Sequence, residues 1–177
     1  MRISLFNGKQ KKHQQSKKDA LKGVNEIQFS NAEFLPEVVR ILNEGHTVTL
    51  RLRGFSMRPY LEDNRDKALL TKPTNPQKGD PVLAEVEPRH YVLHRIVDIN
   101  GDNVTLRGDG NLGFEYCKLD NIVGAVIGFY RKERDTLDLT NGKKWKTYSW
   151  FWMHLAPFRR YLLAFYRRIW IPLFGFA

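Results

Sequence analysis

The stretch HYVLHRIVDINGDNVTLR, residues 90–107, decides the fold class. It contains two segments of alternating apolar and polar residues, at 90–98 and 103–107, which is the pattern of half-buried strands. Between them stands Asn100-Gly101, and both of these residues tolerate a positive φ. The stretch therefore predicts two antiparallel strands joined by a tight hairpin.

Further strands are predicted on both sides of this hairpin. Val48, Leu50 and Leu52 alternate with polar residues and indicate a half-buried strand that begins near His46. The other strands are expected at residues 66–71, 81–86 and 121–131. We therefore expect a mainly β domain, a coiled antiparallel sheet partly closed like a small barrel.

A short helix is expected before the sheet and an amphipathic helix after it. Apolar residues between Phe34 and Leu42 recur at helical spacing, and Gly45 ends that helix. Residues 132–147 are interpreted as a charged loop with a turn at Asn141-Gly142. In the tail, a helix of two or three turns would carry on one face Leu155, Phe158, Leu162, Phe165 and Ile169.

The tail has two interpretations, which the sequence leaves open. Arginine pairs flank its apolar face, so the helix could lie on a membrane surface, with tryptophan rings at the depth of the headgroups. Alternatively, the apolar face packs on its own domain or on another protein. The tryptophans are Trp145, Trp150, Trp152 and Trp170.

Charge and composition divide the chain into three parts. The net charge of +10 is the sum of +6 in residues 1–25, −3 in residues 26–130 and +7 in residues 131–177. We expect a flexible basic arm at 1–29, a β domain with its leading helix at 30–131, and a charged loop with a basic aromatic tail at 132–177. The charged ends favour an anionic membrane as a peripheral partner.

Composition also limits cofactors and location. The single cysteine, Cys117, excludes a disulfide within the chain and a thiolate-rich metal site. No metal or cofactor is expected. Because no apolar run has the length of a signal sequence or a spanning helix, we expect a cytoplasmic protein, peripheral on the inner face of the membrane. The sequence leaves the oligomeric state open.

Three polar stretches contain candidate catalytic residues. Ser56 follows a glycine bend at the end of a strand, where its hydroxyl would be displayed for attack on a carbonyl. His94 shares a strand face with Val92 and Ile96, so its imidazole points inward or into a cleft. Asp109, in a polar loop after a strand, could orient an imidazole or shape the turn.

In this order, the stretches resemble the S24/S26 serine peptidases, the clan of signal peptidases and LexA-type self-cleaving repressors. The resemblance runs from about Val48 to Phe129. Its pieces are GFSMRPYL at 54–61, KGDPVL at 78–83, YVLHRIV at 91–97, RGDGN at 107–111 and NIVGAVIGF at 121–129. Other members of the clan have lysine at the place of His94. With histidine there, the sequence is most similar to the archaeal and endoplasmic-reticulum signal peptidases.

The resemblance implies a role for each matched residue. Ser56 matches the nucleophile, His94 the general base, and Met57 a residue that lines the substrate cleft; Gly54 is the second candidate for substrate binding. Asp109 and Glu115 match two acidic positions, either of which would orient His94, and Glu115 is favoured. An imidazole with a pKa near ~6.5 can take the serine proton close to neutral pH.

Two differences from the family are visible. Gly54 stands where signal peptidases often have a hydroxyl residue, which leaves the backbone N–H of Ser56 as the expected oxyanion donor. A Lys-rich arm and a short helix precede the Ser56 strand instead of a spanning helix, so we do not expect a housekeeping signal peptidase.

The sequence therefore predicts a serine endopeptidase that cleaves a peptide or protein substrate, such as a precursor or leader peptide; the family implies cleavage after a small residue. One alternative is a LexA-like self-cleaving regulator, although only about 45 residues precede the strand, too few and too polar for a helix-turn-helix domain. The other is a non-catalytic peptide-binding module on the same fold. Nucleic acid is not an expected partner, because it gives no reason for the aromatic residues beside the tail arginines.

Overall fold

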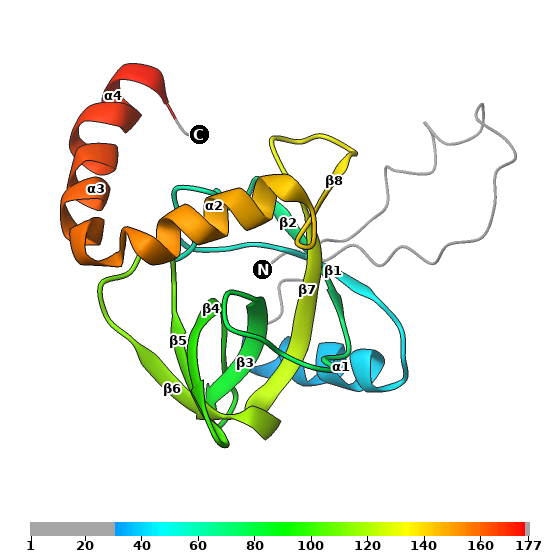
Figure 1. Cartoon of the computed structure of the whole chain (residues 1–177). Helices are drawn as coiled ribbons and strands as arrows, with labels where there is room; N and C mark the ends of the chain where they lie inside the picture. Colours follow the sequence, from blue (N-terminus) through cyan, green and yellow to red (C-terminus); the bar gives the residue numbers. More distant parts are fainter. Residues whose placement is uncertain (1–30, 176–177) are drawn as a thin grey trace, which may run out of the picture.

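Strands make up most of the regular structure in residues 31–175, which the computed structural model describes (Figure 1). The arm expected at residues 1–29 lies outside the described residues. The strands are β1 (Val48–Arg51), β2 (Lys67–Thr71), β3 (Pro81–Glu87), β4 (His90–Asn100), β5 (Asn103–Arg107), β6 (Glu115–Lys118), β7 (Ile122–Tyr130) and β8 (Leu137–Leu139). They form one sheet, so the expected mainly β fold is confirmed.

The sheet is antiparallel and is not closed into a barrel. Its strand order is β1-β2-β7-β3-β4-β5-β6, and β8 pairs with β7. The predicted hairpin joins β4 to β5, with Asn100 paired to Asn103. Its turn therefore consists of Gly101 and Asp102, one residue later than expected, and Gly101 has the positive φ of +57°. This hairpin supplies two strands beside the candidate site.

Two strands were not expected from the sequence. The first, β6, is a four-residue edge strand that carries Glu115 and pairs with β5. The second, β8, lies within the predicted charged loop 132–147, which also contains the start of a helix. Both strands are too short to show an alternating pattern, so their pairing depends on the neighbouring strand.

Helices stand before and after the sheet. Helix α1 (Asn31–Asn43) ends at Gly45, whose φ of +86° and N–H bond to the Leu42 carbonyl close the helix as predicted. The C-terminal helical segment is longer than the expected two or three turns. It consists of α2 (Lys143–His154), the 3₁₀ turn η3 (Ala156–Phe158), α3 (Arg159–Phe165), the π-helical turn η4 (Tyr166–Trp170) and α4 (Ile171–Phe174).

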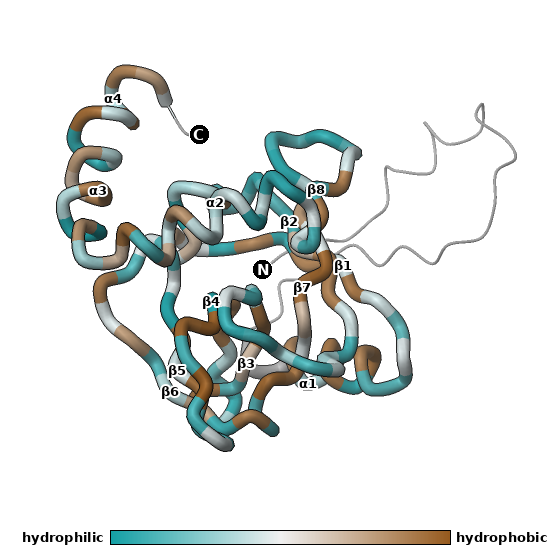
Figure 2. The backbone as a smooth tube through the Cα atoms, viewed as in Figure 1, coloured by the Kyte–Doolittle hydropathy of each residue, from teal (hydrophilic) through white to brown (hydrophobic). Residues whose placement is uncertain are grey.

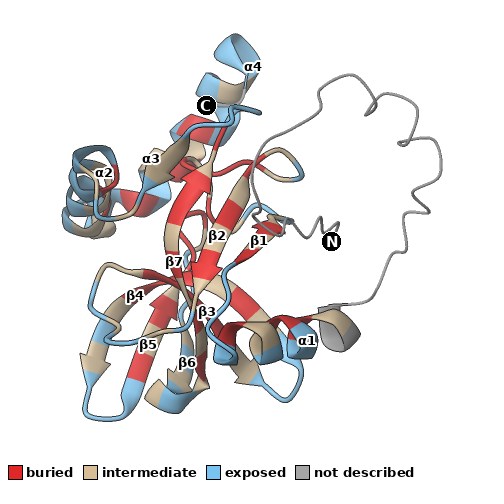
Figure 3. Cartoon of the chain, turned by 90° about the vertical axis from the view of Figure 1, so that its right-hand side faces the viewer, coloured by how far each residue is buried: buried red, intermediate tan, exposed pale blue. Residues whose placement is uncertain are grey.

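Buried residues form two apolar clusters along the middle of the sheet (Figure 3). The larger cluster joins α1, β1, β2, β7 and α2, and it contains Met57 and Trp145. The smaller one joins β3, β4 and β5, and it contains Val92 and Ile96 on either side of His94 in the chain. The candidate site therefore lies where the two clusters meet.

The C-terminal segment has a part that packs on the sheet and a part that is exposed. Helix α2 lies across the sheet, with Trp145 and Trp152 buried, whereas α3 and α4 turn away from it (Figure 1). Trp145 and Trp152 are thus core residues and not membrane-facing ones, while Trp150 and Trp170 are exposed. Colouring by the hydropathy of each residue shows brown, apolar positions between teal, polar ones along α3 and α4 (Figure 2).

Within residues 31–175, no helix combines the length and the apolar character needed to cross a membrane.

Candidate functional site

The turn that carries Ser56 follows β1 and is bent at Gly54. Gly54 has a φ of +94°, a conformation that glycine adopts without strain, and its N–H donates to Asp63 Oδ1 over 2.7 Å. The amide of Arg58 then donates to the carbonyl of Phe55 over 3.2 Å. Ser56 is therefore held on a tight turn at the end of a strand, as expected, and is partly exposed.

The RGDGN loop packs directly against the backbone of this turn. The N–H of Gly110 donates to the carbonyl of Ser56 over 2.7 Å. A β-carbon at Gly110 would lie 2.4 Å from the carbonyl oxygen of Phe55, and one at Gly108 would lie 2.5 Å from that of Ser56. Both glycines are thus required by close approach of two backbones, without a positive φ at either.

His94 lies on β4 beside this contact, with its ring buried. Its Nδ1 forms a 2.5 Å hydrogen bond with Glu115 Oε2 from β6. Because a carboxylate is an acceptor, Nδ1 carries the proton and Nε2 is left as the acceptor of the neutral ring. Glu115 thus fixes the tautomer that a general base requires.

The environment of His94 favours the neutral imidazole. Burial lowers the pKa of His94 below its ordinary value, and the charge and hydrogen bond of Glu115 oppose that shift. The ring is therefore unprotonated near neutral pH and able to accept a proton. On protonation, the imidazolium would be stabilised by the adjacent carboxylate.

The Ser56 carbonyl and the His94 ring both lie close to Gly108. The point where a Gly108 β-carbon would stand is 2.5 Å from the Ser56 carbonyl oxygen and 3.0 Å from His94 Nε2. Within the described part of the chain, the Ser56 hydroxyl and His94 Nε2 are not hydrogen-bonded, and the Ser56 N–H has no partner.

Asp109, the other acidic candidate, pairs with an arginine instead of His94. Its two carboxylate oxygens accept from Arg95 Nε over 2.9 Å and Nη2 over 2.7 Å, and both side chains are fully buried. Tyr148 of α2 donates its hydroxyl to Asp109 Oδ2 over 2.9 Å, and Trp152 Nε1 donates to the Asp109 carbonyl over 3.2 Å. Through these hydrogen bonds, Asp109 connects the RGDGN loop to α2.

A small pocket of about 50 Å³ opens beside Ser56. Met57 and Gly54, the two substrate-binding candidates, line it together with Leu52, Leu61 and Leu93. Arg53 and Glu62 complete the lining.

Sequence reasoning missed the contribution of α2 to this site. Arg95 also bonds Ser149 Oγ of α2 and places its guanidinium over the Trp145 ring at 4.6 Å. The available signal was the spacing of Trp145, Tyr148 and Trp152, which puts three aromatic rings on one helical face. Among residues 31–175, no group of three or more His, Cys, Asp or Glu side chains is arranged to hold a metal ion.

No protein-family model matches the chain, and no curated protein matches it.

Proposed function

We propose that the protein is a serine endopeptidase in which Ser56 is the nucleophile, His94 the general base and Glu115 the residue that orients His94. The observation that carries this proposal is the hydrogen bond between Glu115 and His94 Nδ1. It leaves His94 Nε2 free beside Gly108, in the RGDGN loop that contacts the Ser56 turn. Nucleophile, base and orienting carboxylate are the parts of a serine-type site. The resemblance to S24/S26 peptidases supports the same assignment.

In this mechanism the Ser56 hydroxyl attacks the scissile carbonyl while His94 Nε2 takes its proton. The tetrahedral oxyanion would be held by the Ser56 N–H, and one such donor is worth about 10²–10³ in rate. His94 then gives the proton to the leaving amine, which leaves an acyl-enzyme on Ser56. Water, deprotonated by His94, hydrolyses the ester and restores the serine.

The pocket beside Ser56 supports cleavage after a small residue. Its volume of about 50 Å³ and its lining by Met57 and three leucines favour a small apolar side chain such as alanine. A precursor or leader peptide with such a residue before the scissile bond is the proposed substrate class.

Labelling with a fluorophosphonate probe, followed by peptide mass mapping, tests the nucleophile. We expect the label on Ser56, and its loss in both Ser56→Ala and His94→Ala. Digestion of a proteome-derived peptide library should yield cleavages after small residues, with each variant slower by about 10⁴–10⁶ and the double variant no slower than either single variant. Thr74→Ala, at an exposed hydroxyl on the loop after β2, is the control.

The same experiment separates the alternatives. Peptides that bind the protein but are cleaved by neither it nor Ser56→Ala, with no label on Ser56, would identify a non-catalytic binding module. Truncation of the purified protein on standing, detected by intact mass and absent in Ser56→Ala, would identify a self-cleaving regulator.

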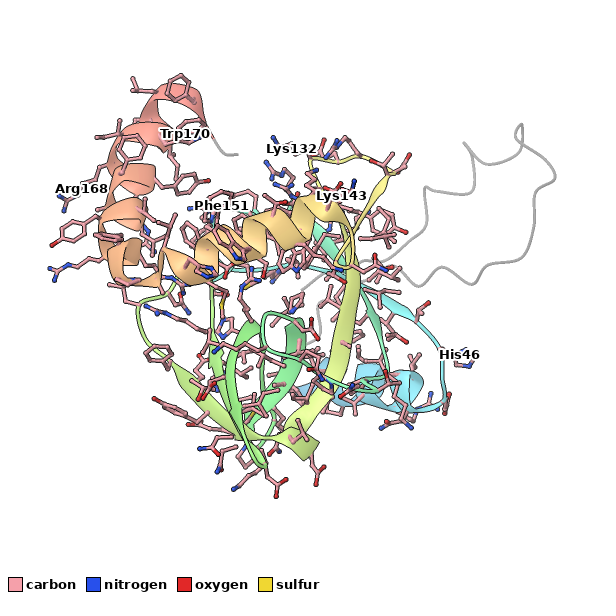
Figure 4. All side chains as sticks on the ribbon, viewed as in Figure 1. His46, Lys132, Lys143, Phe151, Arg168 and Trp170 are labelled. Atoms are coloured by element: carbon pink, nitrogen blue, oxygen red, sulfur yellow. The ribbon has the colours of Figure 1, made fainter. Side chains whose placement is uncertain are left out.

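A second proposal concerns the C-terminal segment, which we infer lies on an anionic membrane surface at its cytoplasmic side. Large apolar side chains exposed on this segment are Trp150, Phe151, Leu155, Phe158, Tyr161, Phe165, Ile169, Trp170, Leu173 and Phe174. Contiguous exposed apolar side chains mark an interaction surface. Arg160 and Arg168 are exposed among them, and Figure 4 shows Arg168 and Trp170 on the part that turns away from the sheet.

Vesicle co-sedimentation tests this surface. The full chain should bind vesicles of phosphatidylserine and phosphatidylcholine at low salt and dissociate as salt rises, since each surface Lys or Arg contributes about 1 kcal/mol before screening. Phe165→Ser with Ile169→Ser should weaken binding strongly. Tyr116→Ser, an exposed aromatic on β6, is the control. Deletion of 148–177 is unsuitable, because it removes the α2 contacts to Asp109.

A further inference from the structure

A second pocket, of about 600 Å³, lies between strands β4, β5 and β6 and the junction of α2 with η3. We call it the arginine pocket, after its lining residues Arg107 and Arg159. It shares no lining residue with the pocket at Ser56. Its volume is within the range of roughly 300–1,000 Å³ that is typical of small-molecule sites.

Arg159 is a buried cation whose bonds are all to main-chain carbonyls. Arg159 is only 2% exposed. Its guanidinium donates to the carbonyls of Gly108 and Trp152, each over 3.4 Å. Its Nε is buried with no hydrogen-bond partner. Buried guanidinium groups usually bind a carboxylate, so this arrangement lacks a counter-charge.

Arg107 brings a second guanidinium to the same pocket. It donates to the carbonyls of Asn111 over 3.3 Å and Leu112 over 3.0 Å, and it lies over the Phe114 ring at 4.6 Å. Within residues 31–175, neither Arg107 nor Arg159 forms an ion pair with a carboxylate. The carbonyl bonds fix the position of Arg107 without neutralising its charge.

The nearby carboxylates are engaged elsewhere. Both oxygens of Asp109 are bound by Arg95, and Tyr148 donates to one of them. Asp98, which lines the pocket, lies 3.5 Å from Lys78 on its exposed rim. The lining therefore has an excess of two positive charges, both on arginines.

The pKa values of Arg159 and Arg107 are both lowered, so the charged form of each guanidinium is disfavoured in this pocket. Burial, and after it the positive charge of Arg107, lower the pKa of Arg159 to about 10, against the opposing charge of Asp109. Burial also lowers the pKa of Arg107. An anion placed between the two guanidinium groups would offset both the desolvation and the repulsion.

We propose that the arginine pocket binds a small organic anion through a phosphate or carboxylate group held by Arg107 and Arg159. Guanidinium forks match the geometry of both kinds of oxyanion, and the rings of Phe114 and Tyr116 provide apolar surface for the rest of the ligand. The site is independent of the proposed peptidase activity. Because Arg159 bonds the carbonyl of Gly108, the ligand would bind a side chain that also contacts the RGDGN loop, whose Gly110 bonds the Ser56 carbonyl.

Thermal unfolding and titration calorimetry with the full chain test this proposal, with citrate, pyrophosphate and inorganic phosphate as ligands. At about 100 times its Kd, a bound anion should raise Tm by about 5–10 °C. Sodium chloride at equal ionic strength should not. Arg107→Gln should weaken binding at least tenfold, whereas Arg89→Gln, on the exposed β3–β4 turn, should bind as the parent does.

Arg159→Gln should also lose the anion effect. If Arg159→Gln does not fold, Arg107→Gln alone tests the site. Arg107 is partly exposed, so its replacement should leave the fold intact. The proposal is overturned if none of the three anions gives heat or a Tm shift. It is equally overturned if Arg168→Gln, on the exposed C-terminal segment, weakens binding as much as Arg107→Gln does.

Discussion

The N–H of Gly110 donates a 2.7 Å hydrogen bond to the carbonyl oxygen of Ser56. This bond joins the turn after β1 to the loop after β5, two segments more than fifty residues apart in the chain. The same loop carries Gly108, which faces His94 Nε2, and Asp109, which is fastened to α2. The relative position of Ser56 and His94 therefore depends on this loop.

Replacing Gly108 by alanine should disable the site. Its β-carbon would lie 2.5 Å from the Ser56 carbonyl oxygen, so the two backbones must separate. We expect a stability loss of about 1–3 kcal/mol, measured by denaturant unfolding, and at least ~10²-fold slower peptide cleavage. Gly113→Ala, in the same loop with open space around it, is the control and should change neither. Full activity in Gly108→Ala would contradict the proposed geometry.

Glu115→Gln should move the pH dependence of kcat/KM in a definite direction. The Glu115 charge raises the pKa of His94 against the lowering effect of burial. Without that charge the pKa falls further, so the acid limb of the profile moves to lower pH. Cleavage should also slow by about 10²–10⁴, because the tautomer is no longer fixed.

The matched control for Glu115→Gln is Glu87→Gln, at an exposed carboxylate 3.8 Å from His90. It should leave the profile unchanged. An upward shift of the acid limb in Glu115→Gln, or an unchanged rate, would show that Glu115 does not act through His94.

Asp109→Asn should reduce stability more than any other single change at the site. The variant leaves the fully buried Arg95 without its carboxylate and weakens the contact with Tyr148. Removing one member of a buried ion pair typically costs about 3–5 kcal/mol, which is about 6–20 °C in Tm for a chain of this size. Asp102→Asn, in the exposed β4–β5 turn, should melt with the parent protein. If Asp109→Asn and Asp102→Asn have the same Tm, Asp109 does not have this structural role.

Asp66 should contribute to stability against acid. Burial raises its pKa, but hydrogen bonds from Arg65 and from the amides of Lys132 and Glu62 outweigh burial, so the pKa is lowered overall. Its stabilisation is therefore present above the pKa of the unfolded chain and is lost as pH falls through the folded value. Asp66→Asn should unfold more easily at pH 7 and show a flatter loss of stability below pH ~4, measured by urea unfolding; Asp135→Asn should follow the parent. If the free energy of unfolding of Asp66→Asn falls with decreasing pH as steeply as that of the parent protein, Asp66 does not have this role.

The parts of the fold that the sequence predicted are those governed by local periodicity. β4, β5 and the hairpin between them follow from alternation and from a residue pair that tolerates positive φ, and α1 follows from helical spacing and Gly45. The edge strand β6 and the short strand β8 were missed, since four and three residues carry no readable period. Helix α2 was placed too late, because its first turn is polar and resembles the loop before it.

By itself, the sequence determined six of the eight described strands, the turn at Ser56 and the inward direction of His94, because each depends on residues adjacent in the chain. The choice between the two carboxylates was decided only by tertiary structure. β6 brings Glu115 to His94, while Asp109, fifteen residues from His94, is taken by Arg95 and by Tyr148 of α2. A carboxylate binds the donors that packing places within reach, and that packing joins segments whose spacing in the sequence says nothing of their distance in space.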